Sequence, residues 1–419
     1  MTHVPAEAEK SSRNAMVNRG PFEIAGFVAG AAQSGMRYKG RPDLALVCSV
    51  EPEGCPAAGV FTRNLFCAAP VELCRQRLQG GKARAILANA GIANACTGEE
   101  GKARAAQMAQ LASKALGCPA ESVLVCSTGV IGQQLDVGPV ERCMPELARS
   151  LGPKGWQDAA RAIMTTDTVE KMASVQVELE EGKKVTIGGI AKGSGMIAPD
   201  MATLLVLAAT DAAISPEALS YWTRVGADES FNRITVDGDT STNDSLFVLA
   251  GGAAANRLIT DIKSPESLAF GNALAAVLRD LAIQIVMDAE GATKLIEIEV
   301  SGACDHQSAR QVAFTIANSP LVKTAFFGGD ANWGRIVAAA GRAGTPLDAR
   351  RASLFFEELC VFRNGIPVAG KQVEEEASRI FSQKQIRLRL DLGAGTSAFT
   401  AWTCDLSFDY IKINASYRS

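Results

Sequence analysis

The sequence is short of histidine, and this restricts the catalytic chemistry open to it. Only two histidines occur among 419 residues, His3 near the amino terminus and His306 beside Asp305. A Ser-His-Asp or Cys-His site would have to rest on His306 alone. If the chain forms a covalent intermediate, we expect its general base to be another group, and a free α-amine with a pKa of about 8 is one such base.

The sequence also lacks an excess of basic residues and long apolar segments. A net charge of −3 gives no positive field for a nucleic acid. The longest apolar runs, such as 203–210 and 246–255, are too short to span a bilayer. The amino-terminal residues carry acids and no apolar core, which argues against a secretory or transit peptide. We expect a cytoplasmic protein that binds neither nucleic acid nor membrane, with a disordered tail over residues 1–18.

The eleven cysteines do not indicate a disulfide framework or a metal centre. No two of them form a C-x-x-C pair, and zinc ligation needs a clustered spacing that is absent. Cys48, Cys126 and Cys404 lie in apolar runs typical of strands. We therefore expect buried, reduced thiols, with no metal and no bound cofactor.

The rest of the composition, 47% hydrophobic and 21% charged, is that of a globular, enzyme-sized chain. Its length suggests two or three domains, or one large interlocked one. Helical and strand-like periodicities are interspersed, which indicates an α/β protein. Helices are expected at 102–116, 140–151, 156–164, 216–225 and 265–289, with two more pieces around a glycine turn within 319–344. Strands are expected at 44–50, 85–89, 123–126, 175–180, 186–190, 203–210, 233–236, 246–250, 295–300, 354–361 and 386–392. The chain end alternates over 408–413 and is expected to be tied down.

The most informative stretch is KGSGMIAPDMATLLVLAAT, residues 192–210. Three glycines come just ahead of its apolar run: Gly189, Gly193 and Gly195. Glycine lets other groups approach the backbone closely, so this pattern predicts a shaped loop that enters a buried strand at Thr203. Ala202 leaves the carbonyl in front of Thr203 uncrowded, and a hydroxyl at such a junction could attack it. From these residues alone, an ordinary β-forming threonine is the simpler explanation.

Two other stretches carry candidate chemistry. The strand at 123–126 ends in STGVIG, and the N–H groups of its Thr128–Gly129 turn could converge on an oxyanion, although a plain turn is the alternative. The end of the longest expected helix carries Asp288 and Glu290, where carboxylates oppose the helix dipole. They are either a tolerated surface pair or a charge kept for a ligand amine.

The segment DGDTSTND, residues 237–244, has acids at the spacing of a calcium-binding loop. It lacks the glycine at the sixth position and the acid at the twelfth position of such a loop. We therefore expect a turn there.

Ten motifs in order make the chain similar to the glutamate N-acetyltransferase / ornithine acetyltransferase family of arginine biosynthesis. The resemblance runs from about Arg19 to Ser419. The motifs are KGRPDLALV, GVFTRN, NAGIANACTG, STGVIG, AIMTTD, KGSGMIAPDMATLL, FNRITVDGDTSTNDS, DAEGATKL, LVKTAFFGGDANWGRI and YIKINASYRS. The resemblance implies an α/β sandwich of β-sheets flanked by helices, the aminopeptidase-like fold with an amino-terminal nucleophile.

The resemblance further implies that the chain cuts itself between Ala202 and Thr203. The Thr203 hydroxyl would attack the Ala202 carbonyl, the acyl group would move from N to O, and water would release the ester. An α fragment, 19–202, and a β fragment, 203–419, would remain interlocked. Thr203 would then carry a nucleophilic hydroxyl and an amine able to accept its proton, which removes the need for histidine.

Site residues follow from the same resemblance. Thr128 and Gly129 would form the oxyanion hole. Substrate would be bound by Thr166, Lys192, Thr203, Glu290, Asn414 and Ser419. Glu290 would pair with a substrate ammonium, which would account for its place at a helix end. Ser419 departs from the threonine expected in the family, and Ile92 stands where many relatives have a polar residue.

The reaction implied is a ping-pong transfer. N2-acetyl-L-ornithine would acetylate Thr203, ornithine would leave, and L-glutamate would take the acetyl group. Some members also accept acetyl-CoA as a co-substrate, and an α2β2 assembly is expected from the family. Two alternatives stay open: a self-cleaving aminopeptidase or amidohydrolase of similar fold, and a non-catalytic binding module. The motifs AIMTTD and NWGRI favour the transferase.

Overall fold

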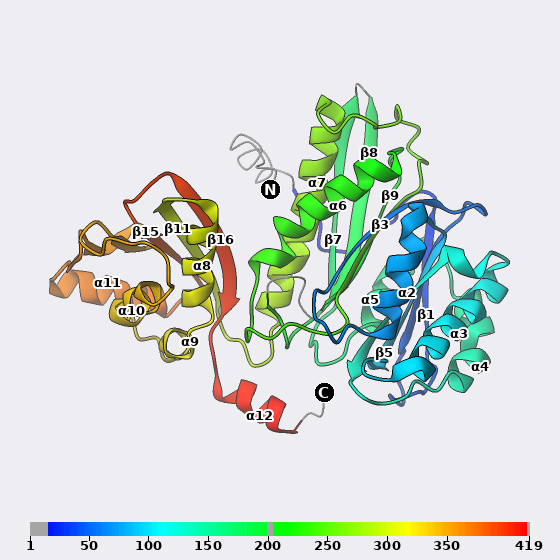
Figure 1. Cartoon of the computed structure of the whole chain (residues 1–419), viewed down its shortest axis with the longest axis horizontal. Coiled ribbons are helices and arrows are strands. Elements are labelled where there is room, and N and C mark those ends of the chain that lie inside the picture. The colour runs from blue at the N-terminus through cyan, green and yellow to red at the C-terminus, as the bar shows by residue number, and fades with distance from the viewer. Residues whose placement is uncertain (1–15, 181, 199–203, 417–419) are drawn as a thin grey trace.

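The computed structural model describes residues 16–180, 182–198 and 204–416. Figure 1 shows two lobes, one built on two sheets and the other on a third sheet, with the carboxy-terminal helix beneath them. The α/β class with helices flanking the sheets, expected from the sequence, is confirmed.

The first sheet has four strands in the order β1-β2-β5-β6. Its outer face is covered by helices α3 and α4, while α5 contacts β1 and β2 of this sheet and β7 and β8 of the next. Strands β5 and β6 are parallel, with Gly91 opposite Gly129. The elements are β1 Phe27–Ala32, β2 Leu44–Ser49, β5 Ala85–Ile92, β6 Val123–Val130, α2 Ala69–Arg77, α3 Gly98–Leu116, α4 Gly138–Arg149 and α5 Trp156–Ala162.

The second sheet has six strands in the order β4-β3-β10-β9-β8-β7. The central strand β9 alternates between two cores: Leu205 and Leu207 face the first sheet, whereas Val206 faces α6 and α7. A strand buried on both faces is apolar throughout, which explains the run read from the sequence. The elements are β3 Cys55–Phe61, β4 Lys82–Ala83, β7 Lys171–Glu180, β8 Lys183–Lys192, β9 Leu205–Thr210, β10 Ser245–Ala250, α6 Pro216–Asp228 and α7 Pro265–Met287.

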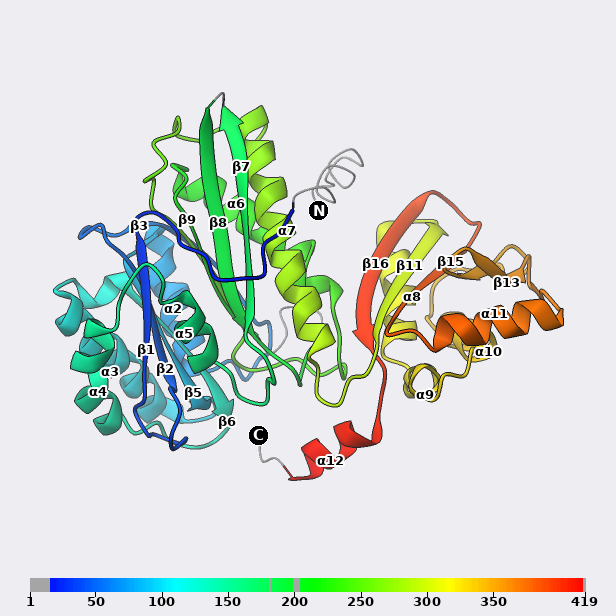
Figure 2. The same cartoon turned by 180° about the vertical axis from the view of Figure 1, so that it is seen from behind.

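Within the described residues, α7 is the one helix long and apolar enough to cross a membrane, and 67% of its apolar window is buried inside the protein. It packs along β7 and β8 as the core helix of this lobe. Figure 2 shows this from behind, with α7 lying against the long β7–β8 hairpin.

The third sheet forms its own lobe, in the order β14-β13-β12-β15-β11-β16. In β11, Ile296, Ile298 and Val300 face the core, and Glu299 on the other face pairs with Arg387 at 2.6 Å. Arg387 therefore lies on the face of the sheet that points away from this core. The elements are β11 Leu295–Ala303, β12 Ser353–Phe356, β13 Leu359–Arg363, β14 Ile366–Pro367, β15 Gln385–Asp391, β16 Ser397–Cys404, α8 His306–Ala317, α9 Pro320–Gly328, α10 Trp333–Gly341, α11 Lys371–Phe381 and α12 Phe408–Ser416.

The alternating chain end is the helix α12, and it is tied down as expected: Asn414 donates to Glu290 and Phe408 packs on Phe327. Two local expectations are wrong. Residues 354–361 form the hairpin of β12 and β13 rather than one strand. Residues 233–236 contain the end of a 3₁₀ helix and a single bridge from Ile234 to Trp402.

The expectation of buried thiols is confirmed for Cys48, Cys126 and Cys404. All eleven cysteines are free, but Cys96 and Cys304 are exposed. Burial raises the pKa of the Cys126 thiol well above its usual value, so it is held as an uncharged core group.

Candidate active site

A cavity of about 80 Å³ lies at the ends of β6 and β8. The segments between α5 and β7, before β10 and after α7 complete its walls, together with α12. Its walls include Thr128, Gly129, Ile131, Thr165, Thr166, Lys192, Gly195, Met196, Ser241, Thr242, Asn243, Glu290 and Asn414. The structure therefore brings together six of the residues that the sequence singled out: Thr128, Gly129, Thr166, Lys192, Glu290 and Asn414. Ala202, Thr203 and Ser419 lie outside the described residues.

Thr128 and Gly129 belong to a strand and not to the turn expected from the sequence. Both are part of β6 and pair with β5. Gly129 has φ +128°, and a Cβ on it would lie 2.2 Å from the carbonyl carbon of Gly91. Only glycine fits this position, because its conformation is left-handed and its neighbour is backbone.

Lys192, the last residue of β8, is buried beside Thr128. Its Nζ donates to Thr128 Oγ1 at 3.3 Å and lies 3.9 Å from Asp167 Oδ2. Burial lowers the pKa of the Lys192 ammonium, and the Coulombic attraction of Asp167 opposes this effect. Because the Thr128 hydroxyl accepts from a cation, its own proton is left to donate to an oxygen in the cavity.

A buried ion network that the sequence did not reveal holds Lys192 in place. Lys171 is fully buried, and its Nζ lies 2.7 Å from Asp167 Oδ1 and 2.6 Å from Asp288 Oδ2. Asp167 also accepts the backbone N–H of Gly193 at 2.8 Å. Burial raises the pKa of the Asp167 carboxyl, but Lys192, Lys171 and its hydrogen bonds outweigh burial and hold that pKa below its usual range.

Glu290 forms the opposite wall of the cavity. Its Oε2 accepts Asn414 Nδ2 at 2.8 Å, so α12 is tied to the end of α7. Its backbone N–H donates to the Ser194 carbonyl, and Ser194 Oγ lies 2.6 Å from Thr166 Oγ1. A side chain on Gly195 would meet the Glu290 carboxylate at 2.5 Å, which explains the glycine there. Thr166, Glu290 and Asn414 are thereby joined through one loop.

The loop that contains Met196 and Ile197 is held by Asp237. Its carboxylate accepts the N–H groups of Met196 at 2.6 Å and Ile197 at 2.8 Å, with Met196 in a left-handed conformation at φ +57°. Tyr410 on α12 adds a hydrogen bond at 3.3 Å. The acidic segment 237–244 is therefore a structural clamp for this loop, in agreement with the turn expected there.

Asp244, at the other end of that segment, is fully buried next to Leu204. Its Oδ1 accepts the Leu204 N–H at 3.0 Å, while Oδ2 has no partner among the described residues. Burial raises its pKa well above the usual value, against hydrogen bonding and the charge of Lys192. The acid pattern of the segment gave no sign of this, because burial is set by the neighbouring strands β9 and β10.

His306 lies elsewhere, in the third lobe. It is the first residue of α8, and its ring packs edge-on against Phe399, with 5.3 Å between the ring centroids. Among the residues that the structure describes, no histidine lines the cavity.

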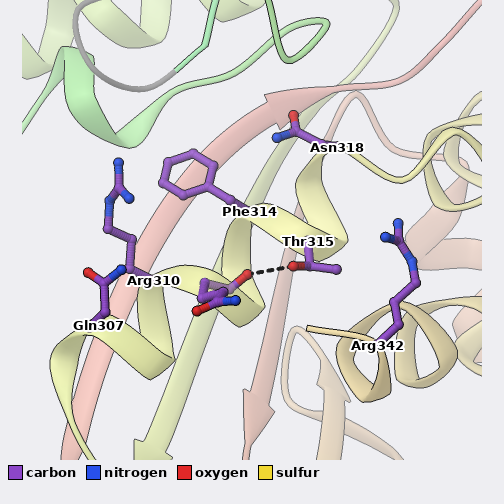
Figure 3. A pocket seen from close by; sticks show the side chains of 7 residues that line it. Gln307, Arg310, Phe314, Thr315, Asn318 and Arg342 are labelled. Carbon is purple, nitrogen blue, oxygen red and sulfur yellow. Dashed lines mark hydrogen bonds between the residues drawn. The ribbon is translucent and has the colours of Figure 1, made fainter. Parts of the chain in front are cut away.

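A broader surface pocket of about 590 Å³ lies along α8 and the end of α10. Figure 3 shows Arg310, Phe314 and Arg342 around it, with Thr315 bonded back to its own helix. Gln311 donates to the Ala343 carbonyl at 2.6 Å, and Asn318 accepts from Thr235 at 2.7 Å. None of the predicted site residues that the structure describes lines this pocket.

Comparison with known proteins agrees with the motif pattern. A family model described as the ArgJ family matches residues 28–419. The arginine biosynthesis bifunctional protein ArgJ of Brucella suis biovar 1 (strain 1330) is 46% identical over 399 residues, covering 94% of this chain and 96% of the relative. The ArgJ protein of Symbiobacterium thermophilum is 50% identical over 397 residues, covering 94% and 97%.

Among solved structures, the ornithine acetyltransferase of Mycobacterium tuberculosis, complexed with ornithine, is 36% identical. It covers 46% of this chain and 100% of that chain, with a TM-score of 0.41. With a family match over residues 28–419 and relatives of 46% and 50% identity over 94% of its length, the chain belongs to the ArgJ family.

Proposed function

We propose that this ArgJ-family chain is an ornithine acetyltransferase of arginine biosynthesis, which moves the acetyl group of N2-acetyl-L-ornithine to L-glutamate through Thr203. The observation that carries the proposal is one cavity that gathers hydroxyl and backbone donors, a buried ammonium and a carboxylate: Thr128, Lys192 and Glu290. These groups are complementary to a carbonyl, a carboxylate and an ammonium, which acetylornithine combines in one molecule.

The first step of the proposed mechanism is self-cleavage between Ala202 and Thr203. The Thr203 hydroxyl attacks the Ala202 carbonyl, the acyl group shifts from N to O, and water hydrolyses the ester to give a new carboxylate and a free α-amine. Support comes from the described neighbours on both sides, because Asp237 fixes residues 196 and 197 and Asp244 fixes Leu204.

The second step is acetyl transfer. The Thr203 hydroxyl attacks the acetyl carbonyl, and its proton passes to the α-amine and then to the departing ornithine nitrogen. The negative oxygen of the tetrahedral intermediate is stabilised by Thr128 and Gly129, where Lys192 leaves the Thr128 hydroxyl proton free to donate. The amine of glutamate then attacks acetyl-Thr203 by the reverse sequence.

Substrate recognition follows from the charges on the walls. The Glu290 carboxylate pairs with the side-chain ammonium of acetylornithine. Asn414 donates to the same Glu290 carboxylate and holds it in place. Lys192 attracts the α-carboxylate that ornithine and glutamate share. Thr166, Thr203 and Ser419 complete the proposed binding set.

The two fragments, 19–202 and 203–419, are proposed to stay interlocked, and an α2β2 assembly in the cytoplasm belongs to the same proposal. The sheet order supports interlocking, because β9 of the second fragment pairs with β8 of the first, and β10 pairs with β3. Native mass measurement of the purified protein tests the assembly.

The proposed function is tested by supplying acetylornithine with and without glutamate and measuring acetylglutamate and free acetate. Acetylglutamate should form only when both are present, with little acetate in either case. If free acetate forms rapidly and added glutamate does not reduce its amount, the chain is not a transferase, and the self-cleaving hydrolase is favoured. A parallel reaction with acetyl-CoA as donor shows whether this co-substrate is accepted.

A further inference from the structure

The two charged side chains of the cavity, Lys192 and Glu290, stand on segments that are far apart in the sequence but bonded to each other. Lys192 ends β8, and Glu290 follows α7. Both side chains line the same cavity. The Glu290 N–H donates to the Ser194 carbonyl at 2.9 Å, so the ammonium and the carboxylate are carried by neighbouring backbones.

Asp288 gives the segment that carries Glu290 a second anchor. It caps the end of α7, and its Oδ2 lies 2.6 Å from Lys171 Nζ and accepts the Thr168 N–H at 3.0 Å. Its Oδ1 accepts the Thr168 hydroxyl. A carboxylate at the carboxy-terminal end of a helix opposes the helix dipole. The fully buried Lys171 compensates for this, and so it fastens the end of α7 to the segment between α5 and β7.

Asp167 anchors the opposite wall from the same segment. Its Oδ1 lies 2.7 Å from Lys171 Nζ, and its Oδ2 lies 3.9 Å from Lys192 Nζ. Its Oδ1 also accepts the Gly193 N–H at 2.8 Å. The Lys171 ammonium is therefore shared by one carboxylate at each wall. A buried ion network of this kind resists displacement, because the loss of one partner leaves an uncompensated charge. It fixes how far Lys192 stands from Glu290.

A fixed separation between an ammonium and a carboxylate selects ligands by length when they carry the opposite charges at their two ends. We propose that Asp288 is a specificity-determining positioning residue: it holds Glu290 at the distance from Lys192 that suits the ornithine side chain. This inference rests on the proposed function, in which Lys192 attracts the α-carboxylate and Glu290 pairs with the side-chain ammonium. Enzymes distinguish substrates that differ by one methylene by about 10–200-fold, and the wild type should discriminate in this range.

The test is Asp288→Asn, with Asp280→Asn as the matched control. With glutamate as acceptor, kcat/KM is measured for N2-acetyl-L-ornithine and for its homologues one methylene longer and one shorter, N2-acetyl-L-lysine and N2-acetyl-L-2,4-diaminobutyrate. The asparagine amide would present donors to Lys171 and to the Thr168 N–H, which releases the end of α7. We expect D288N to raise the KM for acetylornithine and to lower its preference over the homologues by about 10-fold or more. Asp280 pairs with Arg19 at 2.8 Å on the same helix, so D280N should keep the wild-type preference.

Folded D288N that keeps the wild-type preference would overturn the inference, even if its activity falls equally with all three donors, because the network would then serve stability alone. A wild type that does not discriminate among the three donors would overturn it as well. If D288N is unfolded or inactive, Thr168→Val carries the same test, since it removes one donor to Asp288 at an exposed position. An unchanged preference in that variant is again the overturning result. The proposed function fails instead if the wild type makes no acetylglutamate from acetylornithine, so the two failures are distinguishable.

Discussion

The side-chain amide of Asn243 donates to the Ser127 carbonyl at 2.8 Å, and so it ties the loop before β10 to the strand that carries Thr128. The same nitrogen donates to the Ala93 carbonyl at 2.6 Å. These bonds join the first sheet to the second at the cavity. The position of Thr128 and Gly129, the proposed oxyanion donors, therefore depends on Asn243, which lies in a loop and in neither sheet.

We predict that Asn243→Ala lowers kcat without raising KM. Truncation leaves two buried carbonyls without donors, which costs about 1–3 kcal/mol of stability each, and lets β6 shift relative to the acylated threonine. A displaced oxyanion donor costs up to about 10²–10³-fold in kcat. Steady-state kinetics and thermal unfolding measure both effects. Asn232→Ala, at a half-buried asparagine that donates to Asp228, is the control and should change neither. A large rise in KM with unchanged kcat would contradict the positioning role.

We predict that Thr128→Val is impaired and Thr128→Ser is not. Valine keeps the shape of threonine but removes the hydroxyl that accepts from Lys192 and donates into the cavity. The expected loss in kcat is about 10²-fold or more, whereas serine restores the hydroxyl. Gly129 cannot be probed in the same way, because a Cβ there would meet Gly91 at 2.2 Å and any substitution would disturb the fold. Equal activity of the valine and serine variants would leave only the backbone as oxyanion donor.

We predict two fragments when the purified protein is analysed by mass spectrometry under denaturing conditions. They should end at Ala202 and begin at Thr203, and Edman sequencing of the second should read TLLVL. Thr203→Ala should leave one intact, inactive chain, because alanine has no hydroxyl to attack the carbonyl. A single full-length mass from a fully active preparation would contradict the mechanism.

The sequence predicted the family, the α/β class and six residues of the cavity, because the motifs lie at ends of strongly patterned strands. It did not predict that Thr128 and Gly129 lie within β6, because a Thr-Gly pair is a common turn and its pairing with Gly91 depends on a distant strand. Nor did it predict the helix α12, since alternation over a few residues does not reveal whether a sheet is there to receive them.

The buried ion network was missed for a different reason. Lys171 lies four residues from Asp167 but 117 residues from Asp288, so its second partner has no local signal. Asp244 was assigned to a surface-like acidic turn, although burial between β9 and β10 changes its chemistry completely. Both cases depend on long-range packing that a single sequence does not contain.

We predict that this network makes the protein sensitive to acid. The folded-state pKa of Asp167 lies below its unfolded value, so its ionised form stabilises the fold above about pH 4. This stability is lost as the pH falls below that value towards the folded-state pKa. Asp167→Asn should show a smaller loss of unfolding free energy between about pH 4 and pH 2, and lower stability at pH 7. Chemical denaturation at several pH values measures this. An unchanged acid dependence in the variant would show that other carboxylates dominate.

We predict a single basic limb in the pH profile of kcat/KM. The proposed base is the α-amine of Thr203, whose unperturbed pKa is about 7.7–8.0, and it must be neutral to accept the hydroxyl proton. Activity should therefore rise with pH through the pKa that the amine has in the cavity. Burial would lower that pKa, whereas a nearby carboxylate such as that of Glu290 would raise it.

The rival base is His306, and its place in the fold argues against it. It begins α8 in the third lobe, packs on Phe399 and is not among the residues that line the cavity. His306→Gln should therefore keep the cleavage, the rate and the basic limb of the wild type. If this variant folds and is cleaved but no longer transfers acetyl groups, the amine cannot be the base, and a mechanism based on histidine must replace it.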